Sequence, residues 1–333
     1  MNIIGFEKSV GRERYRIAQI KKAVFCDLID DWQQATTLPG ELRKKLQENF
    51  SLQINAKIFR SQDGKTTKAK IKLADGSAIE TVLMQSSKKR NTVCVSSQVG
   101  CALGCLFCAT GRMGFRRNLS PDEIVEQVIF FARELKKEGE RITNIVFMGM
   151  GEPFLNYENV IESIRILNDA DGFNLGARHF SISTVGILEG IEKLKKEKLD
   201  INLAISLHAP DNGLRSKLIP INKKYPIEKV IKAVDSYIKE KKRKVMFEYI
   251  LIKDVNDSDE QAASVARLMK KHLYHVNLIA YNQTGNYFPS PINRRKKFRN
   301  ILMRAGVSAT ERFRFGLDLD GACGQLAGRT HCT

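Results

Sequence analysis

GCALGCLFCATG, residues 100–111, places three of the chain's seven cysteines within eight positions. The stretch follows residues 93–97, a strand-like run. Three thiols this close together are typical of a metal-binding site. In folds that alternate strands and helices, loops at the carboxyl ends of the strands carry the chemistry. We therefore interpret this stretch as a metal-binding loop after the first strand of an α/β domain.

The identity of the metal follows from the number of ligands. Cys101, Cys105 and Cys108 have C-x3-C-x2-C spacing, whereas a closed structural zinc site needs four protein ligands. A [4Fe–4S] cluster held by three cysteines leaves one iron open to a small molecule. The alternative is a zinc site completed by Cys94 or a histidine. We favour the iron–sulfur cluster.

The rest of the chain predicts the architecture. Strand-like runs alternate with amphipathic helices, and they lie at 93–97, 142–148, 179–185, 201–207, 245–252 and 276–280. Such alternation predicts parallel strands with helices outside. Six units are too few to close an eight-stranded barrel, so we expect an α/β fold with a partial, laterally open (β/α)6 barrel.

The N-terminal part has a different pattern. Residues 14–50 have helical periodicity broken near Pro39, and residues 52–84 alternate like a short β-hairpin layer with turns at Gly64 and Gly76. We expect a helical accessory domain over 1–50, a small β extension over 51–90 and the barrel, ending in a C-terminal loop, over 91–333.

The charge of the chain favours a polyanionic partner. Fifty-five Lys and Arg against 37 Asp and Glu give a net charge of +18, and nucleic acid is the partner that this favours. Short basic clusters lie at 88–90, 112–117, 239–244 and 294–297. No apolar run is long enough to span a membrane, and residues 1–11 lack a secretory signal, so we expect a cytoplasmic protein without a membrane partner, acting as a monomer.

Seven motifs together resemble the RlmN/Cfr family of radical S-adenosylmethionine (SAM) RNA adenine methyl synthases. They are CVSSQVGCALGCLFCATG (94–111), GMGEP (149–153), SISTVGI (181–187), AISLHAP (204–210), LIPINKKYP (218–226), VNLIAYN (276–282) and ACGQLAG (322–328). The resemblance implies a radical SAM barrel, a [4Fe–4S] cluster on the three cysteines and two SAM molecules per turnover. It assigns SAM binding to Gly151, Glu152, Ser183, Ser206, Leu207, His208 and Asn282.

The resemblance also implies a role for three further residues. Cys323 would carry the methyl group as S-methylcysteine, and Cys94 would resolve the intermediate through a transient disulfide bond with Cys323. Glu80 would be the proton acceptor. Read without the resemblance, the two cysteines are ordinary free thiols and Glu80 is a surface strand residue. Cys26 and Cys332 match no motif.

The implied reaction is methylation of carbon 2 of an adenine in 23S rRNA, before full ribosome assembly, and also of the adenine beside the anticodon in tRNA. Flavodoxin or ferredoxin would supply electrons. Members that methylate carbon 8 of the ribosomal adenine, and so confer antibiotic resistance, are the alternative within the family. A different radical SAM enzyme and a zinc-stabilised RNA-binding protein are the alternatives outside it.

Overall fold

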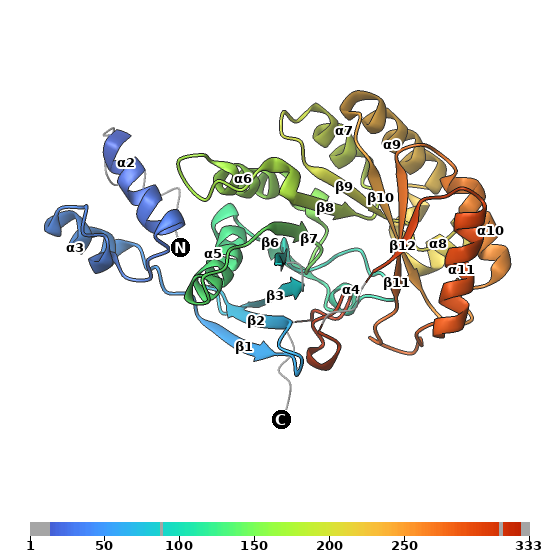
Figure 1. Ribbon diagram of the computed structural model, residues 1–333, viewed down its shortest axis with the longest axis horizontal. Coiled ribbons are helices and arrows are strands. Elements are labelled where there is room, and N and C mark those ends of the chain that lie inside the picture. The colour runs from blue at the N-terminus through green and yellow to red at the C-terminus, as the bar shows by residue number, and fades with distance from the viewer. Residues whose placement is uncertain (1–13, 87–88, 313–315, 328–333) are drawn as a thin grey trace.

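The computed structural model describes residues 14–86, 89–312 and 316–327 of the chain. Its centre is one ten-stranded sheet in the order β1-β2-β3-β4-β7-β8-β9-β10-β11-β12. From β4 onward every neighbouring pair is parallel, and helices cover the outside (Figure 1). This is the partial barrel that the alternation of strands and helices predicts.

All six predicted parallel strands are present. They are β4 (Arg90–Val95), β7 (Asn144–Phe147), β8 (Phe180–Thr184), β9 (Asn202–Ser206), β10 (Val245–Leu251) and β11 (Tyr274–Ala280). A short seventh strand, β12 (Ala309–Glu311), pairs with β11 at the edge of the sheet. The helices of the barrel are α5 (Pro121–Lys137), α6 (Tyr157–Asn168), α7 (Leu188–Lys196), α8 (Asn212–Leu218), α9 (Ile227–Lys241), α10 (Asp259–Met269) and α11 (Ile292–Arg304).

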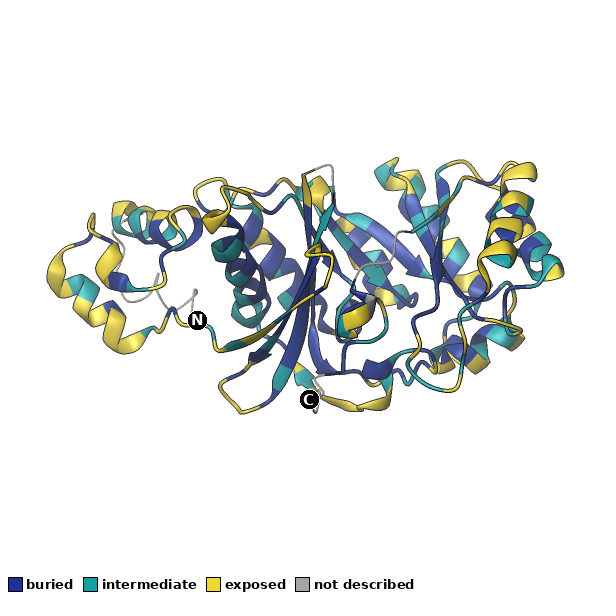
Figure 2. Cartoon of the chain, turned by 60° about the horizontal axis from the view of Figure 1, so that its bottom comes forward, coloured by how far each residue is buried: buried dark blue, intermediate teal, exposed yellow. Residues whose placement is uncertain are grey.

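The predicted β-hairpin layer is part of the same sheet. Strands β1 (Ala56–Arg60), β2 (Thr66–Lys72) and β3 (Ala78–Ser86) are antiparallel, and β3 pairs with β4 so that Val82 lies opposite Cys94. Strands β2 and β3 are largely buried, as the dark strands through the middle of Figure 2 show, whereas β1 at the edge of the sheet has no buried residue. The extension therefore continues the wall of the barrel.

A second, two-stranded sheet carries the cysteine loop. Strand β5 (Gln98–Gly100) and strand β6 (Phe115–Asn118) pair antiparallel, and the short helix α4 (Ala109–Arg112) lies in the segment between them. Helix α5 follows directly, and it begins with a capping box, in which the Ser120 hydroxyl accepts from the Glu123 amide. The loop is thus fixed between a hairpin and a well-capped helix.

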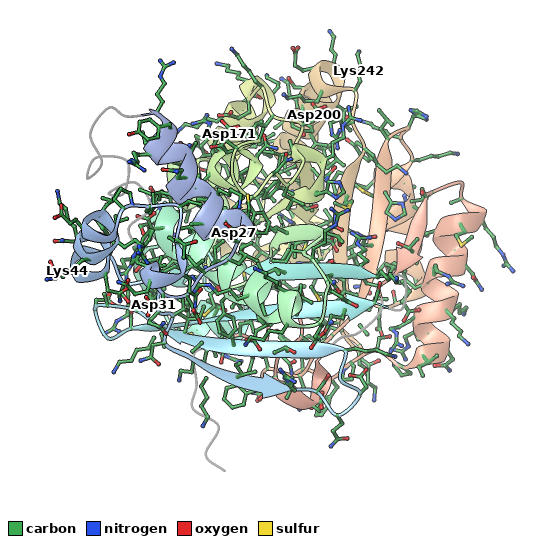
Figure 3. The ribbon with its side chains drawn as sticks, turned by 60° about the vertical axis from the view of Figure 1, so that its left-hand side comes forward. Asp27, Asp31, Lys44, Asp171, Asp200 and Lys242 are labelled. Atoms are coloured by element: carbon green, nitrogen blue, oxygen red, sulfur yellow. The ribbon has the colours of Figure 1, made fainter. Side chains whose placement is uncertain are left out.

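The N-terminal helices stand at one end of the molecule (Figure 1). They are α2 (Arg14–Lys21), the π-helical turn Lys22–Cys26, the 3-10 turn Trp32–Gln34 and α3 (Gly40–Asn49). Trp32 and Leu46 are fully buried in this region, whereas Lys44 on α3 points to solvent at its outer edge (Figure 3). Among the described residues no helix is long and apolar enough to cross a bilayer.

The C-terminal residues 316–327, here called the carrier segment, enter the mouth of the barrel. The Gly324 carbonyl accepts a hydrogen bond from the Ala109 amide at 2.8 Å, and the Leu326 carbonyl accepts one from the Thr110 hydroxyl at 2.5 Å. These bonds connect the segment to the helix that follows the cysteine loop. Residues far apart in sequence therefore meet at one end of the sheet.

Candidate active site

The cysteine loop depends on a glycine. Gly100 has φ of +77°, and a Cβ at this position would lie 1.9 Å from the Gly114 carbonyl oxygen. That same carbonyl accepts the Cys101 amide at 2.9 Å. Only glycine permits this close approach, which fixes the first cysteine of the triplet.

The three thiols of the triplet share one protected environment. Cys101 and Cys105 are buried and Cys108 is half-buried. Burial raises the pKa of Cys101 to about 12, and burial together with the nearby Cys108 and Cys101 raises the pKa of Cys105. Binding a metal would have to displace these protons, because the thiolate is the ligand.

The described side chains do not form a ready-made site for a single metal ion. Within the described ranges, no three His, Cys, Asp or Glu side chains converge closely enough to hold one metal ion. Zinc needs sulfur ligands at about 2.3 Å, whereas an iron–sulfur cluster distributes its thiolates over several irons. Cys94, the proposed fourth zinc ligand, lies in a separate cavity with Cys323. The zinc alternative therefore loses Cys94 as its fourth ligand.

The residues expected to bind SAM lie at the carboxyl ends of neighbouring strands. Gly151 and Glu152 follow β7, Ser183 lies near the end of β8, and Asn282 follows β11. Ser206, Leu207 and His208 lie at or just after the end of β9. The parallel sheet thus brings residues from four separate motifs to one edge.

The glycines of the 149–153 motif are required by close packing of the backbone. A Cβ at Gly149 would lie 2.7 Å from the Val95 carbonyl, and one at Gly151 would lie 2.6 Å from the Gln98 Cβ. In the structure they make room for the segment between β4 and β5.

Glu152 is held as a buried carboxylate between two strand ends. Its oxygens accept from the Phe154 amide at 3.0 Å and the Val185 amide at 3.0 Å. Burial raises its pKa to about 7, and its charge raises the pKa values of Cys101 and Cys105. This carboxylate is therefore an acceptor next to the cysteine loop, suited to an ammonium group.

His208 contacts the cysteine loop as a neutral ring. Its φ is +58°, its Nδ1 accepts from the Ile250 amide at 3.1 Å, and its ring packs edge-on against Phe107, with centroids 4.7 Å apart. Burial, with a contribution from Arg215, lowers its pKa to about 3. The proton therefore resides on Nε2 at neutral pH.

Arg215 is a positioning residue that the sequence did not reveal. It is 1% exposed, and its guanidinium donates to the carbonyls of Val185, Ser206 and Leu207 at 2.6, 2.9 and 3.0 Å. It therefore fixes the ends of β8 and β9 where SAM is expected. An arginine in a short amphipathic helix is ordinarily exposed, so the sequence carried no signal for this role.

Cys94 and Cys323 line one cavity of about 390 Å³ inside the barrel. Cys94 is buried on β4, Cys323 is exposed on the carrier segment, and apolar side chains such as Val82 and Met148 form much of the remaining wall. Asn282 donates to the Cys323 carbonyl at 3.1 Å, and its buried Oδ1 has no partner within the described structure. The cavity thus joins the two lone cysteines to the predicted SAM site.

The six described cysteines are all free thiols, so the expected disulfide bond is absent from this structure. Cys94 is fixed by the pairing of β4, whereas Cys323 belongs to the separate carrier segment. Burial and the neighbouring Cys323 raise the pKa of Cys94 to about 12, and Arg312 opposes this rise. Cys332 lies outside the described residues.

Arg312 is the second functional residue that the sequence did not reveal. It lines the cavity of the two thiols, lies 3.7 Å from the Glu248 carboxylate and donates to the Met148 sulfur at 3.3 Å. Glu248 is itself buried, and it accepts from Asn277 at 3.0 Å. This chain of contacts holds a positive charge beside the thiols.

Glu80 is buried, so the prediction of a surface position from the residues alone is wrong. It is 2% exposed because β2 and the carrier segment cover it. Its carboxylate lies 3.5 Å from the Lys68 ammonium and accepts the Ala327 amide at 3.1 Å. It lines a second, polar cavity of about 170 Å³, on which Cys94 and Cys323 do not border.

Comparisons with known proteins agree with this fold. A family model described as the radical SAM superfamily matches residues 95–266. The probable dual-specificity RNA methyltransferase RlmN of Dictyoglomus thermophilum is 49% identical over 95% of this chain and 91% of the relative. The ribosomal RNA large subunit methyltransferase N of Nitrosopumilus maritimus is 46% identical over 95% and 93%. The crystal structure of a radical SAM methyltransferase from Sphaerobacter thermophilus has a TM-score of 0.94 at 43% identity, covering 98% of this chain and 96% of that one.

Proposed function

Because the chain belongs to the radical SAM superfamily, and within it to the RlmN family of RNA methyltransferases, we propose that it methylates carbon 2 of adenine in RNA through a methyl group carried on Cys323. The observation that supports this route best is the cavity shared by Cys323 and Cys94. The resolving thiol must reach the sulfur of the carrier thiol, and one shared cavity gives Cys94 a path to Cys323.

The proposed substrates are 23S rRNA and tRNA. The Dictyoglomus relative is named a dual-specificity RNA methyltransferase, and we extend that specificity to this chain. A stacked base cannot reach a thiol inside a barrel, so the target adenine must be unpaired and turned out of its stack. We therefore propose that the protein acts on rRNA before full ribosome assembly. We also propose that it acts as a monomer.

The chemistry divides among the chain's own residues. Cys101, Cys105 and Cys108 would hold a [4Fe–4S] cluster, and Glu152, Ser206 and Asn282 are among the residues that would hold SAM. When bound, the cluster and SAM supply the electron and the radical that activate the methyl group. Before that event, the Cys323 thiolate would take the methyl group from a separate SAM molecule. Each turnover would therefore consume two SAM molecules.

Cys94 and Glu80 would together release the methylated RNA. Attack of the Cys94 thiolate on the Cys323 sulfur would break the carbon–sulfur bond to the base and leave a disulfide between the two cysteines. The released methylene carbon would keep the electron pair of that bond and take up a proton to become the methyl group. An electron donor such as flavodoxin or ferredoxin would supply the electrons that the reaction needs. Glu80 would accept the ring proton after the carrier segment, to which its carboxylate is hydrogen-bonded through Ala327, has moved.

The test is mass spectrometry of nucleosides from a 23S rRNA fragment incubated with anaerobically reconstituted protein, SAM and a reductant. We expect 2-methyladenosine from the wild type and from the matched control Cys26→Ala, whose exposed thiol lies outside the cavity. Cys323→Ala should form none, and Cys94→Ala should accumulate a covalent protein–RNA adduct. Methylation by Cys323→Ala would overturn the carrier role, and 8-methyladenosine would overturn the assignment of carbon 2.

A further inference from the structure

The five residues 112–116, RMGFR, project an unusual combination of side chains. Met113 is 43% exposed and Phe115 is 47% exposed, and the flanking Arg112 and Arg116 are exposed as well. Large apolar side chains that gather on a surface mark a site of interaction. We call this segment the RMGFR turn.

The turn is rigid, because its middle and its end are fixed. The Gly114 carbonyl accepts the Cys101 amide at 2.9 Å, and the residue that follows the turn, Arg117, bonds to Asp75 at 2.7 Å and to Glu123 at 2.8 Å. The exposure of Phe115 is therefore a property of a fixed backbone. A rigid aromatic surface loses little entropy when a partner binds.

The turn also lies at the entrance to the catalytic region. It begins four residues after Cys108, and Arg112 lines the polar cavity that Glu80 and Ala327 border. The carrier segment with Cys323 forms another part of that cavity's wall. A partner on this turn would be adjacent to the place where a target base must enter.

Ion pairs distinguish the 294–297 cluster from this turn. In the 294–297 cluster, Arg294 bonds to Asp254 and Asp257, Arg295 to Glu311 and Lys297 to Asp259. Within the part of the chain that the structure describes, Arg112 and Arg116 form no ion pair with a carboxylate. Their charges remain available to an anionic partner.

We propose that the RMGFR turn is a docking surface for single-stranded RNA next to the target adenine, an inference that rests on the proposed function. A base would stack on Phe115 beside Met113, and Arg112 and Arg116 would contact the flanking phosphates. Aromatic stacking combined with arginine–phosphate contacts is how proteins bind unpaired RNA. The charge of the turn favours RNA over an apolar protein partner.

Phe115→Ala tests the stacking contact. Binding of the fluorescently labelled 23S rRNA fragment is measured by anisotropy at several salt concentrations. We expect the dissociation constant to rise about tenfold, with the salt dependence unchanged, because stacking carries no charge. Phe115→Tyr should bind like the wild type. The matched control is Met303→Ala, which removes an equally exposed side chain at the last turn of α11, at the opposite end of the barrel.

Arg116→Ala tests the phosphate contact. Loss of one phosphate contact lowers the slope of log affinity against log salt by about 0.7 for a single strand. Arg304→Ala, which removes an exposed arginine beside Met303, should leave the slope unchanged. Iron content and melting temperature of each variant show that the cysteine loop is intact.

Wild-type affinity in Phe115→Ala together with an unchanged slope in Arg116→Ala would overturn the docking surface. If the wild type methylates no RNA while both variants still lose affinity as expected, the docking surface stands and the proposed function fails. If the wild type methylates the fragment and neither variant loses affinity, the proposed function stands and the docking surface fails.

Discussion

Gly100 controls the geometry of the cysteine loop. Alanine at this position would combine a left-handed φ with a Cβ 1.9 Å from the Gly114 carbonyl. We expect Gly100→Ala to lower the free energy of unfolding by roughly 3 kcal/mol or more, the range of a strained backbone with an added clash. The reconstituted protein should also contain less iron, because the Cys101 amide loses its fixed acceptor.

Gly76 provides the matched control for this prediction. Its φ is +80°, yet nothing lies within 4 Å of the Cβ that alanine would add. Gly76→Ala should therefore cost only about 1 kcal/mol, from the backbone conformation alone. Urea unfolding of both variants separates the two effects, and equal losses would show that the contact with Gly114 is unimportant.

The pH dependence of Cys94 reactivity follows from its surroundings. Burial and the neighbouring Cys323 raise its pKa to about 12. Because only the thiolate form is alkylated, the alkylation rate of Cys94 should rise about tenfold per pH unit from pH 7 to 10 without levelling off. Arg312→Gln should slow alkylation further, because Arg312 lowers this pKa. Mass spectrometry of the Cys94 peptide measures both rates, and a plateau near pH 9 would contradict the prediction.

At this scale, the sequence predicted residues whose role depends on local spacing. Spacing alone indicated the metal-binding role of Cys101, Cys105 and Cys108. The roles of Cys94 and Cys323 were found only through the resemblance. Arg215 and Arg312 could not be predicted. Whether an arginine is buried depends on strands and helices that pack around it in three dimensions, and a single sequence does not contain that information.

Helix α5 connects its cap to the end of a catalytic strand. Gln127 on this helix accepts the Ser96 amide at 2.8 Å and donates to the Ser96 carbonyl at 2.9 Å, two residues after Cys94. Ser120 begins the helix with a complete capping box. The position of the strand end therefore depends on the start of the helix.

Ser120→Ala should lower the free energy of unfolding by about 1 kcal/mol, because an amide of the first turn loses its acceptor. Ser120→Asp is the control, since an aspartate also accepts at this position and interacts favourably with the helix dipole. The melting temperatures of the two variants, measured by thermal unfolding, test this prediction. Equal melting temperatures for Ala and Asp would exclude the cap as a source of stability.

The elements were predicted according to their length and regularity. The six parallel strands all overlap the ranges that the sequence predicted, although β7 has only four residues. Strand β12 has three residues, too few to show a period, and it exists only because β11 provides a partner. The sequence also did not predict that β3 pairs with β4 in one sheet, because pairing between strands is a tertiary contact.

Besides apolar packing, polar bonds connect the N-terminal helices to the rest of the molecule. Lys21 pairs with Asp169 at 2.8 Å, and Lys136 on α5 donates to the Asp27 carbonyl at 2.5 Å (Figure 3 labels Asp27). Arg133 on α5 donates to the Leu52 carbonyl at 2.8 Å and also to the Ile29 carbonyl. One arginine thus holds both ends of the segment between α2 and β1.

Arg133→Met should loosen this region while the barrel remains folded. Methionine keeps an apolar stem of similar length, but the Ile29 and Leu52 carbonyls lose their donor. We expect amide hydrogen exchange to become faster across residues 14–52 and to stay unchanged in β7 to β11. The control is Arg267→Met on α10, whose guanidinium donates only to Ser264 in the same helix among the described bonds. Equal exchange rates in Arg133→Met and the wild type would mean that the buried Trp32 and Leu46 packing, rather than this arginine, holds the N-terminal region in place.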